Sequence, residues 1–477
     1  MLFNSIDFAA FLPMVFLIHW LILRGQRARN AFLLLASYVF YGWWDPRFLS
    51  LLALSSLIDF WVSKRIGKET RTARRKALLL LSLAANLGML GFFKYYDFFV
   101  SNFESAFSLF GHPLQLRHLD IILPVGISFY TFQTLSYTID VYMGRLKPST
   151  DGLSFMAFVS FFPQLVAGPI ERATHLLPQF SKTRSFSLEQ SSDGLRQMLW
   201  GLVKKVVVAD NCAPYVDSIF AAPEAASGST LLVGAMLFSF QIYCDFSGYS
   251  DIAVGCARLF GFDLMRNFAY PYFSRDIAEF WRRWHISLSS WFRDYVYVPL
   301  GGSRGRLGAT MRNTLIIFII SGFWHGANWT FICWGAVHAL YFMPLLLAKR
   351  NRKHMEVVAH DRMLPTLREA VSILGTYLAV VLAWIFFRSN DVHAAMAHIS
   401  GILSPSLFSM PSVRPADVAL MITALIALEW FGRRHQHPLQ MIASVRWRPA
   451  RWAVYYALIA LLISFAKAEQ EFIYFQF

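Results

Sequence analysis

The sequence predicts an all-α polytopic membrane protein, and its composition, apolar runs and loop charges each support that fold class. Of 477 residues, 56% are hydrophobic and only 15% are charged, whereas a soluble domain carries about 25% charged residues. Apolar runs long enough to cross a bilayer recur along the chain. We expect a bundle of roughly 10–12 transmembrane helices, some broken or re-entrant, that encloses a tunnel. Because such a bundle is one continuous body, residues 1–477 are expected to form a single domain.

Basic residues gather in the short links between apolar runs, and this asymmetry predicts how the chain is oriented. The sequence has 44 Lys and Arg against 29 Asp and Glu, a net charge of +15. The links at residues 64–76 and 432–451 are strongly basic and are expected in the cytoplasm, with both chain ends outside. The orientation rule accounts for the positive charge, so no nucleic-acid partner is expected.

The first half of the chain contains ordinary apolar runs followed by two interrupted ones. The ordinary runs lie near residues 8–23, 30–44, 48–62 and 77–93. Prolines, glycines and polar side chains interrupt the next two, at residues 121–143 and 153–170. A lipid-facing helix would not carry so many polar groups, so these segments are expected to line protein or a cavity. The alternative for each is an ordinary proline-kinked packing helix.

Three further segments are assigned from their composition. Residues 195–209, which include Lys204 and Lys205, are predicted to form a short or tilted helix near a surface. Residues 210–229, rich in Ala, Pro and Ser, are predicted to be a loop. Residues 388–416, with several prolines, are predicted to be an external loop.

A polar cluster follows the apolar run that begins at residue 231. The sequence DFSGYSD at residues 245–251 places Tyr249 between the carboxylates of Asp245 and Asp251. We expect this cluster at the end of a helix. Capping of the next helix by Ser250 or Asp251 is the structural alternative.

Residues 274–291 are predicted to form one amphipathic helix at the cytoplasmic interface. Tryptophans recur at helical spacing along this segment, and arginines that include Arg282 and Arg283 share it. A helix with Trp on one face and Arg on the other lies in the membrane interface, among lipids. His285 falls on the aromatic side, where it is either a half-buried interfacial histidine or a functional one.

The stretch at residues 321–329 (SGFWHGANW) places a histidine deep in the membrane. His325 follows Arg312 by 13 residues, about 20 Å along a helix, against a hydrocarbon core of roughly 30 Å. A titratable ring at that depth needs a partner or a wet cavity, and it indicates function by default. The alternative is a core histidine bonded to a neighbouring carbonyl. Gly322 and Gly326 allow a close backbone approach or a break.

Patterns typical of other enzyme classes are absent from the sequence. It contains no HExxH, paired CxxC, Walker A or GxGxxG motif, so neither a metal nor a bound cofactor is expected. The four cysteines are interpreted as small buried hydrophobes. A histidine without its own nucleophile suits general-base activation of an incoming hydroxyl. The acyl group must then come from an activated donor, and a cationic cytoplasmic face suits a phosphate-bearing donor such as an acyl-CoA.

Six motifs resemble those of the membrane-bound O-acyltransferases, specifically their bacterial alginate O-acetyltransferase branch, and the resemblance covers nearly the whole chain. The last two of the six are the most specific. The motifs are residues 91–99 (GFFKYYDFF), 123–129 (LPVGISF), 164–170 (QLVAGPI), 245–251 (DFSGYSD), 280–288 (FWRRWHISL) and 323–329 (FWHGANW).

The resemblance implies an acetyl-CoA-dependent enzyme of the bacterial inner membrane. His325 and His285 match the active-site pair of that family, with His325 the usual catalytic residue. A periplasmic partner of the serine-hydrolase-like kind would receive the acetyl groups and acetylate an exopolysaccharide. The segment around His285 is expected to rim the donor access route, with Arg282 or Arg283 near the donor phosphates. Further substrate-binding residues are expected at Asp245, Tyr249, Trp324 and Asn328.

Two other functions compete with this one. A relative with the same chemistry could move D-alanine to teichoic acid, or acetyl groups to cellulose or peptidoglycan. A transporter or export channel without covalent chemistry would also suit broken polar helices, but it would more often show an internal repeat, and this sequence shows none.

Overall fold

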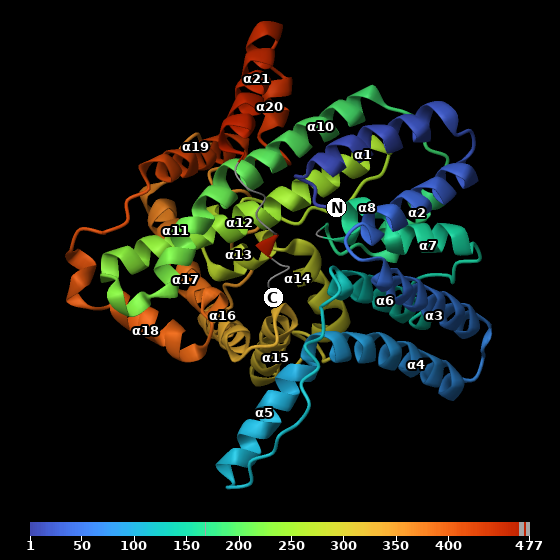
Figure 1. Ribbon diagram of the computed structural model, residues 1–477, viewed down its shortest axis with the longest axis horizontal. Helices are drawn as coiled ribbons and strands as arrows, with labels where there is room; N and C mark the ends of the chain where they lie inside the picture. Colours follow the sequence, from blue (N-terminus) through green and yellow to red (C-terminus); the bar gives the residue numbers. More distant parts are fainter. Residues whose placement is uncertain (167, 467–471, 474–477) are drawn as a thin grey trace. The chain divides into compact units, whose positions relative to one another are not determined.

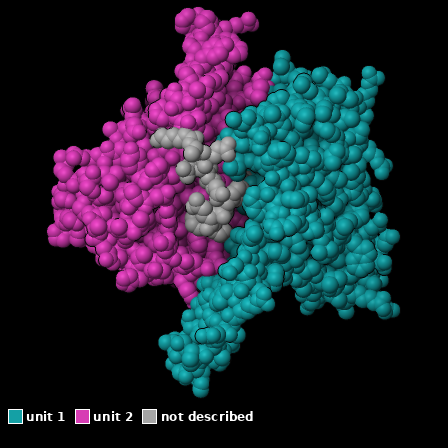
Figure 2. Space-filling view, viewed as in Figure 1, with its two compact units in different colours: residues 1–191, 256–265 teal, residues 192–255, 266–477 magenta. Residues whose placement is uncertain are grey.

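The computed structural model describes residues 1–166, 168–466 and 472–473, and the regular secondary structure of these residues is entirely helical. They form two compact units, coloured separately in Figure 2. Unit 1 comprises Met1–Ser191 and Cys256–Met265, and unit 2 comprises Ser192–Gly255 and Arg266–Phe477. The all-α fold class is confirmed, whereas the single domain stays a prediction.

Unit 1 is built from helices of the first part of the chain (Figure 1). They are α1 (Ile6–Leu17), η1 (Ile18–Ile22), α2 (Gln26–Gly42), η2 (Pro46–Phe48), α3 (Leu49–Lys68), α4 (Thr72–Leu90), η3 (Gly91–Tyr95), α5 (Tyr96–Leu109), α6 (Ile127–Tyr142), α7 (Gly152–Ser160), α8 (Phe162–Leu165) and α9 (Ala173–Ser181). Two longer helices have residues in both units, namely α10 (Leu188–Leu202) and α12 (Gly228–Leu259).

Unit 2 contains both predicted histidines and the remaining helices. They are η4 (Val203–Ala209), α11 (Asp210–Ala221), η5 (Pro223–Ala225), η6 (Pro271–Phe273), α13 (Ile277–Arg283), α14 (Ile286–Phe292), η7 (Arg293–Tyr297), α15 (Leu307–His325), α16 (Trp329–Leu347), α17 (Leu367–Arg388), α18 (Val392–Ile402), η8 (Pro405–Phe408), α19 (Ala416–Gly432), α20 (Leu439–Ala443) and α21 (Arg448–Phe465).

The lengths and compositions of several helices make the chain a multi-pass membrane protein. Five helical segments within the described residues are long and apolar enough to cross a bilayer. They are Thr72–Leu109, Gly228–Leu259, Leu307–His325, Trp329–Leu347 and Leu367–Arg388.

The first polar, interrupted run becomes α6, and its polar side chains contact protein. Gly126 precedes the helix with a φ of 75°, and a Cβ there would lie 2.6 Å from the Leu165 carbonyl oxygen, so the turn requires glycine. Within the helix, Gln133 donates to the Phe158 carbonyl at 3.0 Å, and Thr138 donates to Asp59 at 3.0 Å. The second run breaks at Phe161, between α7 and α8, as the prolines and glycines indicated.

Two predicted loops are wrong in part, because each contains an amphipathic helix. Residues 210–221 of the first form α11, whose Val216 and Ile219 are buried. Within the second, α18 buries Ala395, His398 and Ile402, a spacing that places them on one helical face. The small and proline-rich residues that suggested loops lie mostly outside these helices.

Candidate active site

His325 is the last residue of α15, where the helix stops against α16. Its side chain is buried, and the backbone leaves the helix at Gly326 in an extended conformation. Glycines bring the two helices together, because a Cβ on Gly322 would lie 2.2 Å from the Phe331 carbonyl oxygen. A Cβ on Gly335 would lie 2.3 Å from the Phe318 carbonyl oxygen. The close backbone approach predicted for Gly322 is confirmed.

His285 lies at a break between two short helices, so the prediction of one continuous helix over residues 274–291 is wrong. Helix α13 begins after the Asp276 cap, whose side chain accepts from the Glu279 amide. It ends at Arg283, and α14 begins at Ile286. His285 has a φ of 42°, in the left-handed region. The tryptophan spacing is also compatible with two helical pieces, so periodicity alone did not reveal the break.

Asn267 fixes the chain on the C-terminal side of this break. Its carbonyl oxygen accepts from the Ile286 amide at 2.9 Å, and its side-chain oxygen accepts from the Ser287 hydroxyl at 2.6 Å. Its side-chain nitrogen donates to Ser250 of α12 at 3.1 Å. Three bonds from one buried residue therefore hold the left-handed conformation of His285 against α12.

The two histidine rings lie together inside an aromatic cluster. The ring centroids of His285 and His325 are 6.5 Å apart. Phe246 of α12 lies 4.6 Å from the His285 ring, and Trp324 lies 4.9 Å from the His325 ring. Trp334 of α16 lies 5.1 Å from the His325 ring. Apolar walls of this kind exclude water, which strengthens polar interactions with a substrate at the imidazoles.

The predicted polar cluster at residues 245–251 lies inside α12, which continues unbroken to Leu259, so its expected place at a helix end is wrong. Asp245 accepts from the Ile473 amide at 2.6 Å and pairs with Lys205 at 2.7 Å. The Tyr249 ring lies 4.4 Å from the Phe472 ring. The carboxylate of Asp245 therefore has its partners within the protein, so the helix does not need to end to expose this group to water.

Lys204 and Lys205 are buried, which corrects the predicted helix near a surface. Their side chains are 3% and 2% exposed. Lys204 pairs with Asp251 at 2.6 Å, and Lys205 pairs with both Asp210 at 2.8 Å and Asp245. Buried charges of opposite sign must be matched in position, so these pairs hold η4 and α11 in register with α12.

Arg282 and Arg283 are both engaged in contacts within the protein. Arg282 donates to the carbonyls of Asn351 and His354 at 2.8 and 2.7 Å. Arg283 pairs with Glu279 at 2.8 Å. Burial opposes ionisation of Glu279, but hydrogen bonds from Arg275 and the charge of Arg283 outweigh it and hold the pKa of this carboxyl below its ordinary value. The donor-phosphate role of Arg282 or Arg283 stays a prediction.

A cavity of about 230 Å³ lies beside the same segment of unit 2. Its basic side chains are Arg293 and Arg352, and Arg293 also pairs with Asp294 at 2.7 Å. Trp281 and Phe318 form part of its apolar lining. The lining also includes Ser321, which is one helical turn before His325 on α15.

Trp324 and Asn328 differ in how they relate to the histidines. Trp324 is buried between the two, with its ring 5.9 Å from that of His285. Asn328 caps α16 by accepting from the Thr330 amide at 3.0 Å, and it donates to the Asn390 carbonyl at 2.8 Å. Its substrate-binding role stays a prediction, because these contacts are those of a helix cap.

Sequence reasoning missed several residues of this site. Asn267 had no motif around it, and Phe246 was noted only within the polar cluster. The chain end that includes Phe472 and Ile473 was expected only to lie on the outer side of the membrane, yet both residues are buried against α12 residues. A contact with a residue so distant in sequence leaves no periodic signal. Within the described residues, no group of three or more His, Cys, Asp or Glu side chains is placed to hold a metal ion.

Comparison with known proteins identifies the family of this chain. The sequence model of the membrane-bound O-acyltransferase family matches residues 148–386, which include both histidines. The chain is also 39% identical over 450 residues to the probable alginate O-acetylase AlgI of Pseudomonas aeruginosa, which covers 92% of this chain and 83% of that relative. The chain therefore belongs to the membrane-bound O-acyltransferase family, and it is an O-acyltransferase.

Other relatives carry different names. The peptidoglycan O-acetyltransferase of Helicobacter pylori is 33% identical, over 100% of this chain and 98% of that relative. The teichoic acid D-alanyltransferase of Streptococcus thermophilus is 28% identical over 56% of this chain and 69% of that relative.

Proposed function

We propose that the protein takes acetyl groups from cytoplasmic acetyl-CoA and passes them across the bacterial inner membrane. A periplasmic serine-hydrolase-like partner then transfers them to an exopolysaccharide such as alginate. The paired histidines in the aromatic cluster carry this proposal, because such a site suits acyl transfer to a hydroxyl. The similarity to probable alginate O-acetylases supports the choice of acetyl group and polymer.

The chemistry assigned to the pair follows from general-base catalysis. The acceptor hydroxyl oxygen attacks the thioester carbonyl, a C–O bond forms and the C–S bond breaks. His325 accepts the hydroxyl proton and returns it to the departing sulfur, so that CoA leaves as a thiol. His285, with its ring 6.5 Å from that of His325, is positioned to contact the same reacting group.

The cavity beside Ser321 supports the donor part of the proposal. Arg293 and Arg352 offer positive charge to phosphates, while Trp281 and Phe318 suit the less polar arm of the donor. The cavity includes a residue one turn from His325, as a route for a thioester requires. The sidedness follows from Arg306 and Arg312, which lie at the start of α15 and predict that this first end of the helix faces the cytoplasm.

Acetyl transfer to peptidoglycan is the second candidate. The relative from Helicobacter pylori matches this chain from end to end, whereas 83% of the Pseudomonas aeruginosa relative is covered. The two candidates share the donor and the histidine chemistry and differ only in the final polymer.

Labelled acetyl-CoA tests the shared chemistry. Purified protein in detergent should release CoA thiol in the presence of the periplasmic partner, and His325→Ala should not. Activity with a D-alanyl carrier thioester and none with acetyl-CoA would overturn the donor assignment. The polymer is then identified by measuring O-acetyl groups on exopolysaccharide and on peptidoglycan in cells with and without the protein. Unchanged acetylation of both polymers would reject both candidates.

A further inference from the structure

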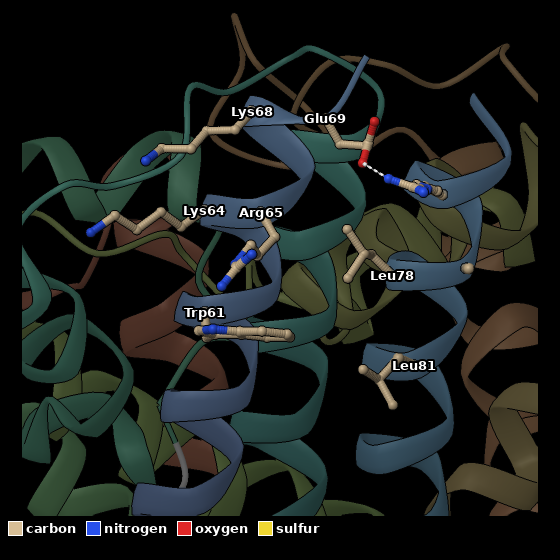
Figure 3. A pocket seen from close by; sticks show the side chains of 9 residues that line it. Trp61, Lys64, Arg65, Lys68, Glu69, Leu78 and Leu81 are labelled. Atoms are coloured by element: carbon tan, nitrogen blue, oxygen red, sulfur yellow. Dashed lines mark ion pairs between the residues drawn. The ribbon is translucent and has the colours of Figure 1, made fainter. Parts of the chain in front are cut away.

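A groove with a cavity of about 900 Å³ lies in unit 1 between the end of α3 and the start of α4 (Figure 3). It lies outside the histidine site and plays no part in the proposed reaction. Its lining combines basic side chains with apolar ones on two antiparallel helices. The lining residues are Trp61, Lys64, Arg65, Lys68, Glu69, Arg74, Ala77, Leu78 and Leu81.

The basic side of the groove carries more positive charge than the protein neutralises. Among the described residues that line the groove, Glu69 is the only acidic one, and this carboxylate accepts from the Thr70 and Arg71 amides at 3.0 Å. Its ion pair is with Arg74, at 3.7 Å. Lys64 and Lys68, both exposed, form no ion pair with any described residue. The groove therefore attracts an anion from its surroundings.

The apolar side of the groove argues for a ligand with a hydrocarbon part. Trp61 and Leu81 are 48% and 51% exposed, and Leu78 extends with Leu81 from α4 toward α3 (Figure 3). Helix α4 begins the candidate span Thr72–Leu109, and only 17% of an 18-residue apolar stretch within that span is buried. A soluble phosphate would gain nothing from these exposed apolar side chains, whereas an acyl chain would cover them.

The spacing along α3 matches the layers of a bilayer. Lys68, Lys64 and Trp61 follow one another at helical intervals of four and three residues, so they share one face. From Lys68 to Trp61 is about 10 Å along the helix. That rise is comparable to the headgroup layer, which is roughly 5–8 Å thick on each side of the hydrocarbon core. The Arg65 guanidinium lies over the Trp61 ring, 5.1 Å from its centroid, and so joins the basic part of the groove to its apolar part.

We propose that this groove binds an anionic phospholipid. Lys64 and Lys68 hold the phosphate, and the first acyl carbons lie on Trp61, Leu78 and Leu81. The groove has positive charge at one end and apolar surface at the other, with a bilayer-like spacing between them. This combination favours a diacyl lipid with a net negative headgroup. The bound lipid would fill the space between α3 and α4 on their exposed side.

Native mass spectrometry of the delipidated full-length protein tests this assignment. The probes are phosphatidylglycerol, phosphatidylethanolamine and glycerol 3-phosphate, each titrated in detergent. Lys64→Gln with Lys68→Gln should weaken phosphatidylglycerol binding by about 30-fold, since each basic side chain near an anionic headgroup contributes roughly fivefold. Lys64→Arg with Lys68→Arg should retain binding. The exposed arginines Arg24 and Arg27, changed together to Gln, give a control with the same loss of charge in unit 1.

Each remaining outcome decides against one part of the proposal. If the lysine double variant and the arginine control lose the same amount of phosphatidylglycerol affinity, the effect is one of non-specific charge and the proposed site is wrong. Phosphatidylethanolamine bound as tightly as phosphatidylglycerol would remove the requirement for negative charge. Glycerol 3-phosphate bound as tightly as the lipid would make the groove a phosphate site. Leu81→Gln should weaken the binding of phosphatidylglycerol and leave the binding of glycerol 3-phosphate unaffected. An unchanged affinity for the lipid would refute the contact between Leu81 and the acyl chain.

Discussion

The imidazole rings of His285 and His325 lie 6.5 Å apart, although one histidine occupies a helix break and the other ends a transmembrane helix. Two separate sets of contacts bring the rings together. Glycines on α15 and α16 place the end of α15, and Asn267 holds the backbone beside His285 against α12. The position of each histidine therefore depends on neighbouring residues, and these can be tested separately from the histidines.

We predict that His325→Ala reduces acetyl transfer by at least about 10²-fold, because the variant loses its general base. The yield and thermal unfolding of the variant should stay close to wild type, since the removed ring ends a helix whose glycine contacts persist. His393→Ala, at an exposed position on α18, is the control and should leave turnover unchanged. Near-normal turnover of His325→Ala would contradict the catalytic assignment.

Asn267 is predicted to act as a positioning residue. Asn267→Ala should lower kcat more than it raises KM, because His285 loses its fixed orientation while the donor cavity is unaffected. The Ser287 and Ser250 hydroxyls would also lose their bonds to the Asn267 side chain, which should cost about 1–3 kcal/mol of stability. Asn267→Asp keeps the acceptor for Ser287 and should restore part of kcat. If both variants lose stability but retain wild-type kcat, the role is structural only.

The donor cavity predicts which arginines affect KM. Arg293→Gln and Arg352→Gln together should raise the KM for acetyl-CoA by about 3–10-fold, and the effect should weaken as salt rises. Arg282→Gln should mainly lower the yield of folded protein, because Arg282 donates to the carbonyls that flank Arg352. Steady-state titrations of acetyl-CoA measure both effects. A higher KM in Arg282→Gln or Arg283→Gln, with Arg293 and Arg352 variants normal, would favour the sequence-based assignment instead.

The stability of unit 1 should depend on pH through His175. Asp263 and Glu171 raise the pKa of His175 to about 10, and Glu171 lies 2.8 Å from its ring. A raised folded-state pKa adds stability that is complete below the ordinary histidine pKa of about 6.5 and is lost as pH rises through about 10. The gap in unfolding temperature between wild type and His175→Gln should therefore shrink between pH 7 and 10. A gap that widens toward high pH would contradict this sign.

The predicted orientation can be mapped at the link that precedes α4. A cysteine introduced as Thr70→Cys should react with a membrane-impermeant thiol reagent only from the cytoplasm, since residues 64–76 are basic. Cys212, Cys244 and Cys256 are buried, so only Cys333 needs replacement to lower background labelling. If residue 70 is labelled in intact cells whose outer membrane admits the reagent, the link lies on the periplasmic side and the predicted orientation is wrong.

Local pattern was enough to predict much of this protein. Composition and apolar runs indicate a helical membrane protein, because the cost of exposing backbone polar groups to lipid leaves few other solutions. The prolines and glycines of residues 153–170 indicate a break, and the structure has one at Phe161. The motif residues around His285 and His325 were sufficient to single out both histidines before any contact was known.

The tertiary structure alone decided which polar groups meet. Lys204 and Lys205 belong by sequence to a short helix near a surface, yet each is buried in an ion pair with a carboxylate of α12. Likewise, the spacing around His285 is that of one helix, whereas bonds from the distant residue Asn267 stabilise a left-handed backbone there. Periodicity reports which face of an element is apolar, which is a local property. The partner of a buried charge or a strained residue is set by the packing of distant segments, where an unmatched group would cost several kcal/mol.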